Sequence, residues 1–186
     1  MTNYKAVIIG GSAGSFQVVT KILSGLDENF KLPVFLCLHR LKHVRSGFVE
    51  ALSLKSKIKI VEPLDKDTIK NGVAYLAPAN YHMYINYARQ ISLSTEPSVN
   101  HSRPSIDLSF YSAADSYRNK ILGIILSGAN KDGAKGIKRL VDLGGTAIVQ
   151  DPNEAQITTM PKSALELINT NYIYNTEQII KFLNNL

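Results

Sequence analysis

The feature that most constrains this chain is a run of small residues at the point where an apolar stretch gives way to a helical pattern. Residues 6–9 (Ala-Val-Ile-Ile) lead directly into Gly10-Gly11-Ser12-Ala13-Gly14, and apolar residues then recur at helical spacing until Gly25. A second apolar run spans residues 32–38. Strand, helix and strand in this rhythm predict a right-handed crossover between two parallel strands, so the chain should begin as an α/β sheet.

The rest of the chain is expected to extend this sheet. Short apolar runs at 57–61, 72–77, 82–85 and 90–93 resemble a small antiparallel insertion or an elaboration of the sheet edge. The parallel rhythm then resumes with helices at 105–117, 133–143 and 160–168, strands at 121–126, 146–150 and 172–174, and a terminal helix at 176–183 capped by Thr176. We expect one domain over residues 1–186, an α/β fold. Its doubly wound, mostly parallel sheet has helices on both faces and a small antiparallel elaboration.

Composition narrows the classes of partner and compartment. The 186 residues carry a formal net charge of +6, but the basic residues are scattered, so an acidic protein partner is favoured over nucleic acid. The single cysteine, Cys37, cannot form an intramolecular disulfide, and its apolar surroundings predict a small buried side chain. Neither a signal peptide nor a run of about 18 apolar residues is present, which favours a cytoplasmic protein without membrane insertion.

Three polar residues follow predicted parallel strands. Ser12 comes after the first strand and His39 after the second, and the loop after the strand at 121–126 reaches Asp132. Because ligands of open parallel sheets bind beyond the carboxyl ends of the strands, these side chains should share one edge. A serine hydroxyl needs a base to take its proton, and an imidazole base needs an acid to orient it. The G-x-S-x-G spacing is that of a nucleophile elbow, but the order Ser, His, Asp differs from that of the α/β-hydrolases.

Each of these residues also has a simpler interpretation. Ser12 could be a helix N-cap in a phosphate- or dinucleotide-binding turn, although the final glycine of G-x-G-x-x-G is missing. The second strand ends in His39-Arg40 where NAD sites have an acid, and an NADP site using Arg40 stays open. Asp132 alone is typical of a helix N-cap.

The remaining histidines are weaker candidates for a functional site. His43 is expected to be solvated and His82 structural, whereas His101 precedes a predicted helix and could face the cleft. No histidine or cysteine shows metal-ligand spacing, so no metal is expected.

Eight ordered blocks of the sequence resemble the catalytic domain of the CheB family, the chemotaxis protein-glutamate methylesterases. The blocks run nearly from end to end: residues 8–14 (Ile-Ile-Gly-Gly-Ser-Ala-Gly), 38–40 (Leu-His-Arg), 74–78 (Ala-Tyr-Leu-Ala-Pro), 103–107 (Arg-Pro-Ser-Ile-Asp), 110–114 (Phe-Tyr-Ser-Ala-Ala), 126–134 (Leu-Ser-Gly-Ala-Asn-Lys-Asp-Gly-Ala), 150–152 (Gln-Asp-Pro) and 160–164 (Met-Pro-Lys-Ser-Ala).

This resemblance implies a function and a set of catalytic residues. The family's catalytic serine, histidine and aspartate fall on Ser12, His39 and Asp132. The implied reaction is hydrolysis of γ-glutamyl methyl esters on the cytoplasmic helices of methyl-accepting chemotaxis receptors, or on a similar methylated protein, with release of methanol. Many relatives also deamidate receptor glutamines. No cofactor is implied.

The resemblance also suggests where substrate would bind. The backbone N–H of Ala13 and one N–H from the Gly128-Ala129 turn would hold the oxyanion, and Arg40 and His101 are further candidate substrate contacts. Family members often have threonine and methionine where this chain has Ala13 and Ala129. Many also carry an N-terminal receiver domain, whereas this sequence begins at the catalytic strand, so we expect a standalone catalytic domain. A non-catalytic module that binds a receptor or another acidic helix is the alternative.

Overall fold

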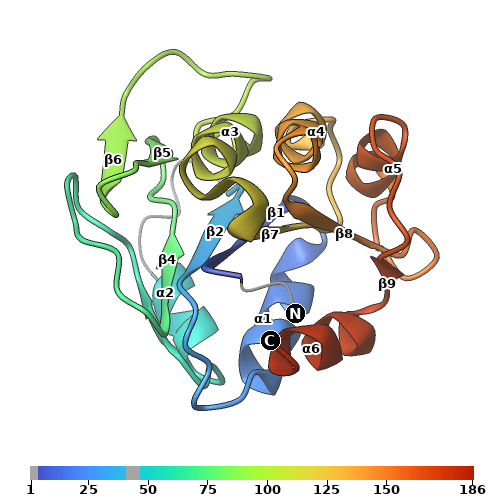
Figure 1. The fold of residues 1–186 in the computed structure, drawn as a ribbon, viewed down its shortest axis with the longest axis horizontal. Helices are drawn as coiled ribbons and strands as arrows, with labels where there is room; N and C mark the ends of the chain where they lie inside the picture. Colours follow the sequence, from blue (N-terminus) through green and yellow to red (C-terminus); the bar gives the residue numbers. More distant parts are fainter. Residues whose placement is uncertain (1–3, 41–46) are drawn as a thin grey trace.

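The computed structural model describes residues 4–40 and 47–186, which form a seven-stranded parallel sheet between two layers of helices (Figure 1). The strand order is β3-β4-β2-β1-β7-β8-β9. β1 is the central strand, with β2, β4 and β3 on one side of it and β7, β8 and β9 on the other, so the direction of winding reverses between β1 and β7. The strands are β1 (Ala6–Gly11), β2 (Val34–Leu38), β3 (Lys59–Val61), β4 (Val73–Leu76), β7 (Ile121–Ile125), β8 (Thr146–Gln150) and β9 (Ile173–Tyr174).

Helices cover both faces of this sheet, as the sequence predicts. The helices of the described residues divide between the two faces (Figure 1). The first layer holds α3 (Ile106–Tyr117), α4 (Ala134–Asp142) and α5 (Thr159–Leu165), and the second holds α1 (Ser15–Gly25), α2 (Phe48–Ser53) and α6 (Thr176–Asn184). A short 3-10 helix, η1 (Arg118–Lys120), joins α3 to β7. The doubly wound α/β fold is confirmed.

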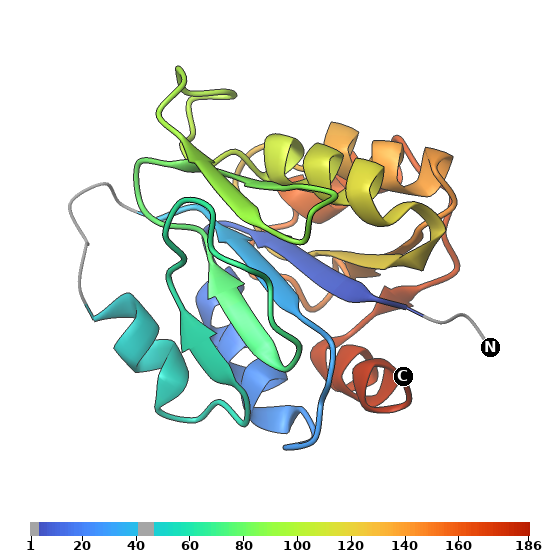
Figure 2. The same ribbon diagram turned by 60° about the vertical axis from the view of Figure 1, so that its left-hand side comes forward.

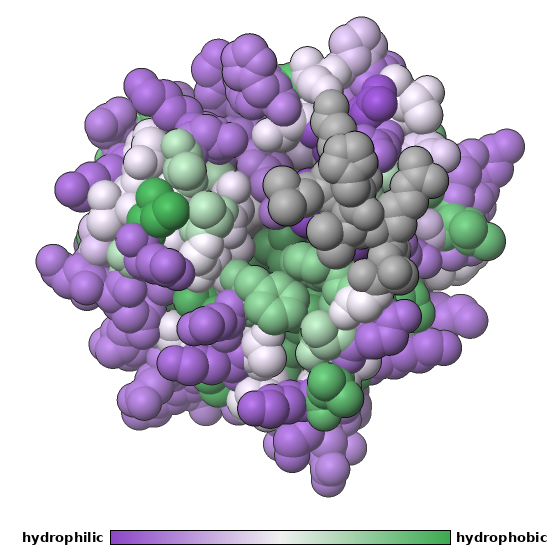
Figure 3. All heavy atoms as spheres, turned by 180° about the vertical axis from the view of Figure 1, so that it is seen from behind, coloured by the Kyte–Doolittle hydropathy of each residue, from purple (hydrophilic) through white to green (hydrophobic). Residues whose placement is uncertain are grey.

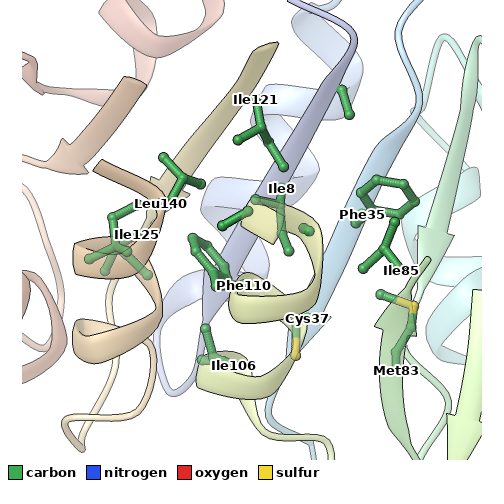
Figure 4. Close-up of a cluster of buried hydrophobic side chains, with 14 of the residues drawn as sticks. Ile8, Phe35, Cys37, Met83, Ile85, Ile106, Phe110, Ile121, Ile125 and Leu140 are labelled. Carbon is green, nitrogen blue, oxygen red and sulfur yellow. The ribbon is translucent and has the colours of Figure 1, made fainter. Parts of the chain in front are cut away.

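The sheet separates two apolar cores because successive side chains of a strand point to opposite faces. In β1, Ile8 faces the α3–α4–α5 layer, whereas Val7 and Ile9 face the α1–α6 layer. Figure 4 shows Ile106 and Phe110 of α3 in the first core together with Ile8. All of these side chains are fully buried.

One part of the predicted topology is wrong. The runs at 57–61 and 72–77 were expected in an antiparallel insertion, but β3 and β4 join the main sheet in parallel register, with β4 beside β2. Among the strands that the structure describes, only β5 (His82–Ile85) and β6 (Ile91–Ser94) form an antiparallel pair, on the same side of the sheet as α3 (Figure 2). Ala74 and Leu76 are buried in the α1–α6 core, which explains why β4 is an interior strand.

The cap of the terminal helix is also different from the prediction. Asn175, not Thr176, is the N-cap of α6, and its side chain accepts a hydrogen bond from the Gln178 N–H at 2.9 Å. The Gln178 side chain accepts the Asn175 N–H in return at 2.9 Å, which completes a capping box. Thr176 instead donates its N–H and its hydroxyl to Glu154.

The outer surface is mainly hydrophilic on the face opposite to the view of Figure 1, with small apolar patches (Figure 3).

Cys37 is buried, and burial raises the pKa of its thiol, so the prediction of a small core side chain is confirmed. Within residues 4–40 and 47–186, no helix is both long and apolar enough to cross a membrane.

Candidate active site

Ser12 lies in the tight turn between β1 and α1. Its N–H donates to the Ser127 carbonyl at 2.9 Å, and its own carbonyl accepts the Ser15 hydroxyl at 2.6 Å. Gly14, at φ +82°, is the N-cap of α1, and a Cβ there would come within 2.7 Å of the Ser127 hydroxyl oxygen. The N-cap interpretation of Ser12 is therefore wrong. The partly exposed Ser12 hydroxyl forms no hydrogen bond with any residue in the described part of the chain.

His39 is held beside Ser12 by the pairing of β1 with β2. Gly11 pairs with Leu38 in the parallel register, and the His39 N–H donates to the Gly11 carbonyl at 3.0 Å. Ser12 and His39 are thus the first residues beyond two neighbouring, paired strand ends. This is the edge of the sheet where the parallel topology predicts a ligand site.

Asp132 reaches His39 from the loop after β7. Its Oδ2 lies 2.8 Å from His39 Nε2, and the carboxylate is fully buried while the imidazole is 11% exposed. The amino end of α3 holds the carboxylate in place, because Oδ2 also accepts the Ile106 N–H at 2.7 Å and Oδ1 accepts the Asp107 N–H at 3.1 Å. The Ser105 hydroxyl donates to Oδ1 at 3.0 Å. The N-cap interpretation of Asp132 is wrong for its own helix, since the N-cap of α4 is Gly133.

The surroundings of Asp132 keep its carboxylate ionised. Burial by itself would raise its pKa, but hydrogen bonds from the His39 ring and from the Ile106 and Asp107 N–H groups hold that pKa below its usual value. An ionised carboxylate accepts the Nε2 proton of His39, so Nδ1 is the ring nitrogen left to accept a proton. Two polar groups lie 3.4 Å from Nδ1, the hydroxyl of Ser102 and the side-chain amide nitrogen of Asn130.

A second buried carboxylate, Asp107, lies beside the first. Asp107 belongs to the first turn of α3, yet its Oδ1 accepts the N–H groups of Gly133 and Gly136 at the start of α4, at 2.9 and 2.7 Å. Burial and the neighbouring Asp132 carboxylate raise the pKa of Asp107 despite these donors. The Asn100 side-chain amide donates to both carboxylates, at 3.2 Å each.

Sequence reasoning missed most of this supporting layer. Hydrogen bonds to Asp132 come from Asn100, Ser105 and Asp107. His82 in turn supports Ser105, because His82 Nδ1 accepts the Ser105 N–H at 3.1 Å. The other ring nitrogen, Nε2, lies 3.0 Å from the Pro97 carbonyl oxygen. The expectation that His82 is structural fits its complete burial. The only available signal was the block of polar residues that precedes α3.

Of the backbone N–H groups that are candidate oxyanion donors, some have no hydrogen-bond acceptor within the described residues and one already donates to a carbonyl. Within the described residues, the N–H groups of Ala13 and Ala129 donate to no protein acceptor. The Gly128 N–H donates to the Ile157 carbonyl at 3.2 Å, so Ala129 is the member of the predicted Gly128-Ala129 turn whose N–H is free of a protein acceptor among the described residues. Gly128 has a packing role instead, because a Cβ there would lie 2.5 Å from the Met160 methyl carbon.

The other predicted contacts lie around this centre. The Arg40 guanidinium is buried and pairs with Glu62, and its carbon lies 5.3 Å from the centre of the Phe48 ring. His101 is exposed, and its neighbours Asn100 and Ser102 are the residues that reach the site. His43 lies outside the described residues. Among those described, no group of three or more histidine, cysteine or acidic side chains is arranged to hold a metal ion.

Comparison with known proteins agrees with this architecture. A protein of Leptospira interrogans, named provisionally as a protein-glutamate methylesterase/protein-glutamine glutaminase, is 41% identical over 95% of this chain and 92% of its own length. A Clostridium acetobutylicum protein-glutamate methylesterase/protein-glutamine glutaminase is 33% identical over 87% of this chain, which spans 47% of that relative. The crystal structure of the Thermotoga maritima CheB methylesterase catalytic domain superposes with a TM-score of 0.92 over 98% of both chains, at 28% identity.

The family model described as CheB methylesterase matches residues 7–183, which include the turn after β1, the end of β2 and the loop after β7. With a match of this extent and relatives above 30% identity, the chain belongs to the CheB methylesterase family of hydrolases.

Proposed function

We propose that the protein hydrolyses γ-glutamyl methyl esters on a protein substrate, with Ser12 as nucleophile, His39 as general base and Asp132 as the acid that orients His39. The observation that carries the proposal is the 2.8 Å contact between His39 Nε2 and a fully buried Asp132 carboxylate, one strand away from Ser12. A buried ion partner fixes the imidazole tautomer and stabilises the imidazolium that forms during the reaction.

The first half of the reaction forms an acyl-enzyme. Ser12 Oγ attacks the ester carbonyl carbon while His39 Nδ1 takes the hydroxyl proton, which requires Oγ and Nδ1 to come within about 2.6–3.2 Å once substrate is bound. The N–H groups of Ala13 and Ala129 then receive the oxyanion, and each such donor contributes about 2.7–4 kcal/mol. Collapse of the tetrahedral intermediate breaks the ester C–O bond, and the imidazolium gives its proton to the departing methoxide, which leaves as methanol.

The second half releases the product. Water attacks the acyl carbon as His39 Nδ1 takes one of its protons, and the Ser12–acyl bond breaks with return of that proton to Oγ. The substrate side chain leaves as a glutamate carboxylic acid. With a glutamine side chain, the same steps release ammonia in place of methanol, which accounts for a glutaminase activity of the same site.

The proposed substrate is the cytoplasmic helical region of a methyl-accepting chemotaxis receptor, or another protein methylated in the same way, and the proposed compartment is the cytoplasm. The family match supports this substrate, and the net charge of +6 suits an acidic protein surface. Residues 1–186 act as one catalytic domain in this proposal.

Methanol release from a methyl-labelled receptor tests the proposal. The wild-type protein should release volatile label, and Ser12→Ala should lower kcat by about 10³-fold or more. Ser24→Ala is a matched control, because it removes a hydroxyl of α1 that donates to the Lys21 carbonyl on the exposed surface and does not touch the Ser12 turn. Undiminished release by Ser12→Ala would refute the assignment. Absence of release by both the wild-type protein and Ser12→Ala would favour the non-catalytic binding module.

A further inference from the structure

A cavity of about 320 Å³ lies beside the candidate catalytic centre and is not used by the mechanism above. Its walls come from the ends of β2, β3, β4 and β6 and from the segment before α3; the lining residues used below are Arg40, Glu62 and Arg103. Arg40 directly follows His39, and Arg103 is separated by one residue from Ser105, whose hydroxyl binds Asp132. The cavity therefore opens on the same edge of the sheet as Ser12 and His39.

The two arginines have hydrogen-bond donors to spare. Arg40 is 2% exposed at its side chain and uses Nη2 on Glu62 and on the Ala77 carbonyl oxygen. Arg103 uses Nη1 on the carbonyl oxygens of Thr95 and Glu96, at 2.6 and 2.9 Å. Nε and Nη1 of Arg40 and Nε of Arg103 are buried without a hydrogen-bond partner among the residues that the structure describes. Leaving charged donors buried and unpaired is costly, so such groups normally meet an acceptor.

The charges lining the cavity indicate which acceptor fits. Among the lining residues that the structure describes, two guanidinium groups and the Glu62 carboxylate leave one net positive charge, which a single carboxylate balances and a phosphate dianion exceeds. Guanidinium forks match the planar geometry of a carboxylate. The Phe48 ring supports the guanidinium of Arg40 from one face and leaves its edges for hydrogen bonding.

We propose that this cavity, the Arg40–Arg103 pocket, binds an acidic side chain of the protein substrate that lies near the esterified glutamate. The inference rests on the proposed function for the identity of the substrate, and it assigns the pocket a role in choosing which glutamyl ester is presented to Ser12. A helical substrate would bring such a carboxylate to the same face as the ester at helical spacing.

Binding without turnover tests the pocket directly. The probes are pairs of synthetic helical peptides that each carry one γ-glutamyl methyl ester. The two members of a pair differ at one position on the same helix face, which is glutamate in one peptide and glutamine in the other, and each pair tests a different position. With the Ser12→Ala protein, the glutamate peptide should bind at least about tenfold more tightly than its glutamine counterpart in one register. Equal affinity of the two peptides in every register would overturn the proposal.

Arginine variants then locate the interaction. In the Ser12→Ala background, Arg40→Gln and Arg103→Gln should each reduce the preference for the glutamate peptide to about threefold or less, and Arg103→Lys should retain part of it. Arg139→Gln is the matched control, because Arg139 lies on α4 and pairs with Asp115 on the surface, so its preference should match that of the parent. A preference that survives both glutamine variants of the pocket would overturn the assignment.

The two proposals can fail separately. A glutamate preference in the Ser12→Ala protein, with no methanol release by the wild-type protein, would support the pocket and refute the esterase. Methanol release without any glutamate preference would support the esterase and refute the pocket. Should Arg40→Gln fail to fold in a thermal melt, Arg103→Gln and the peptide series still decide the question.

Discussion

Each of two buried carboxylates, Asp132 before α4 and Asp107 of α3, binds the amino end of the other helix, but their pKa values shift in opposite directions. Asp132, which precedes α4, accepts two backbone N–H groups at the start of α3, and Asp107 of α3 accepts two at the start of α4. The pKa of Asp132 is nevertheless lowered and that of Asp107 raised. Asp132 has His39 as a hydrogen-bond partner and Asp107 has no cationic partner within the described residues. Helix-end donors alone therefore do not hold the pKa of a buried carboxylate below its ordinary value here, and the imidazole makes the difference.

The largest effect is expected from Asp132→Asn. The neutral amide cannot stabilise the His39 imidazolium, and it can present an N–H where Nε2 needs an acceptor, so kcat for methanol release should fall by about 10⁴-fold. Steady-state kinetics with a methylated substrate measures this loss. A fall of less than tenfold would mean that the pairing with His39 is structural and that the contrast with Asp107 has no catalytic meaning.

Asp107→Asn should have a smaller effect on catalysis, with kcat within about tenfold of the wild type, because Asp107 does not touch His39. Its clearer effect is on the pH dependence of stability. Since the folded-state pKa of Asp107 is raised, the wild-type free energy of unfolding should decline as pH rises from the ordinary value of 3.8 through the folded-state pKa. That decline should be absent in Asp107→Asn.

Asp132 should give the opposite slope in the same experiment. Its folded-state pKa is lowered, so its contribution to stability is complete above the ordinary value of 3.8 and is lost as pH falls through the folded-state pKa. Urea unfolding at a series of pH values separates the two slopes. If the free energies of unfolding of Asp107→Asn and Asp132→Asn change with pH in the same way, the two carboxylates are equivalent, and their pKa values do not shift in opposite directions.

Asn100→Ala should have a moderate effect, because it removes the amide that donates to both carboxylates at 3.2 Å. We expect a loss of about 1–3 kcal/mol in the free energy of unfolding and a further rise in the pKa of Asp107. Chemical denaturation and carboxyl NMR titration measure these changes. If neither the stability nor the Asp107 titration shifts, the amide does not link the two helix ends.

The smallest effect is expected from Asp142→Asn, which removes a carboxylate at the other end of α4. Asp142 pairs with Lys138 at 2.7 Å on the exposed surface, and pairs of this kind contribute about 0.3–0.5 kcal/mol. Its kcat should equal that of the wild type, which makes it the control for loss of a negative charge on this helix. A kinetic defect similar to that of Asp132→Asn would point to a general charge effect.

The central part of the fold follows from local patterns in the sequence. The apolar runs of β1, β2 and β7 and the glycine turn after β1 identify parallel strands, and parallel strands present their carboxyl ends at one edge. That geometry is why Ser12, His39 and the loop to Asp132 could be assigned to the same edge before any coordinates. Alternation of apolar residues does not encode strand direction, however, which is why β3 and β4 were expected to be antiparallel.

The layer around Asp132 could not be predicted in the same way. The conformation of the segment before α3 brings Asn100, Ser105 and Asp107 close to Asp132. That conformation depends on how Ile106 packs against β1. Gly10 permits this close approach, because a Cβ there would lie 2.5 Å from the Ile106 side chain. A polar residue near a helix start is most often a cap for its own helix. That Asp132 and Asp107 each bind the amino end of the other's helix can be recognised only from the three-dimensional positions of α3 and α4.

Labelling with a serine-directed fluorophosphonate, followed by peptide mass analysis, shows directly whether Ser12 is activated through His39 and Asp132. We expect one adduct, on the peptide that contains Ser12, formed rapidly by the wild-type protein and at least about a hundredfold more slowly by Asp132→Asn. An adduct on a different residue, or equal labelling rates for the wild type and Asp132→Asn, would refute the assignment of this triad.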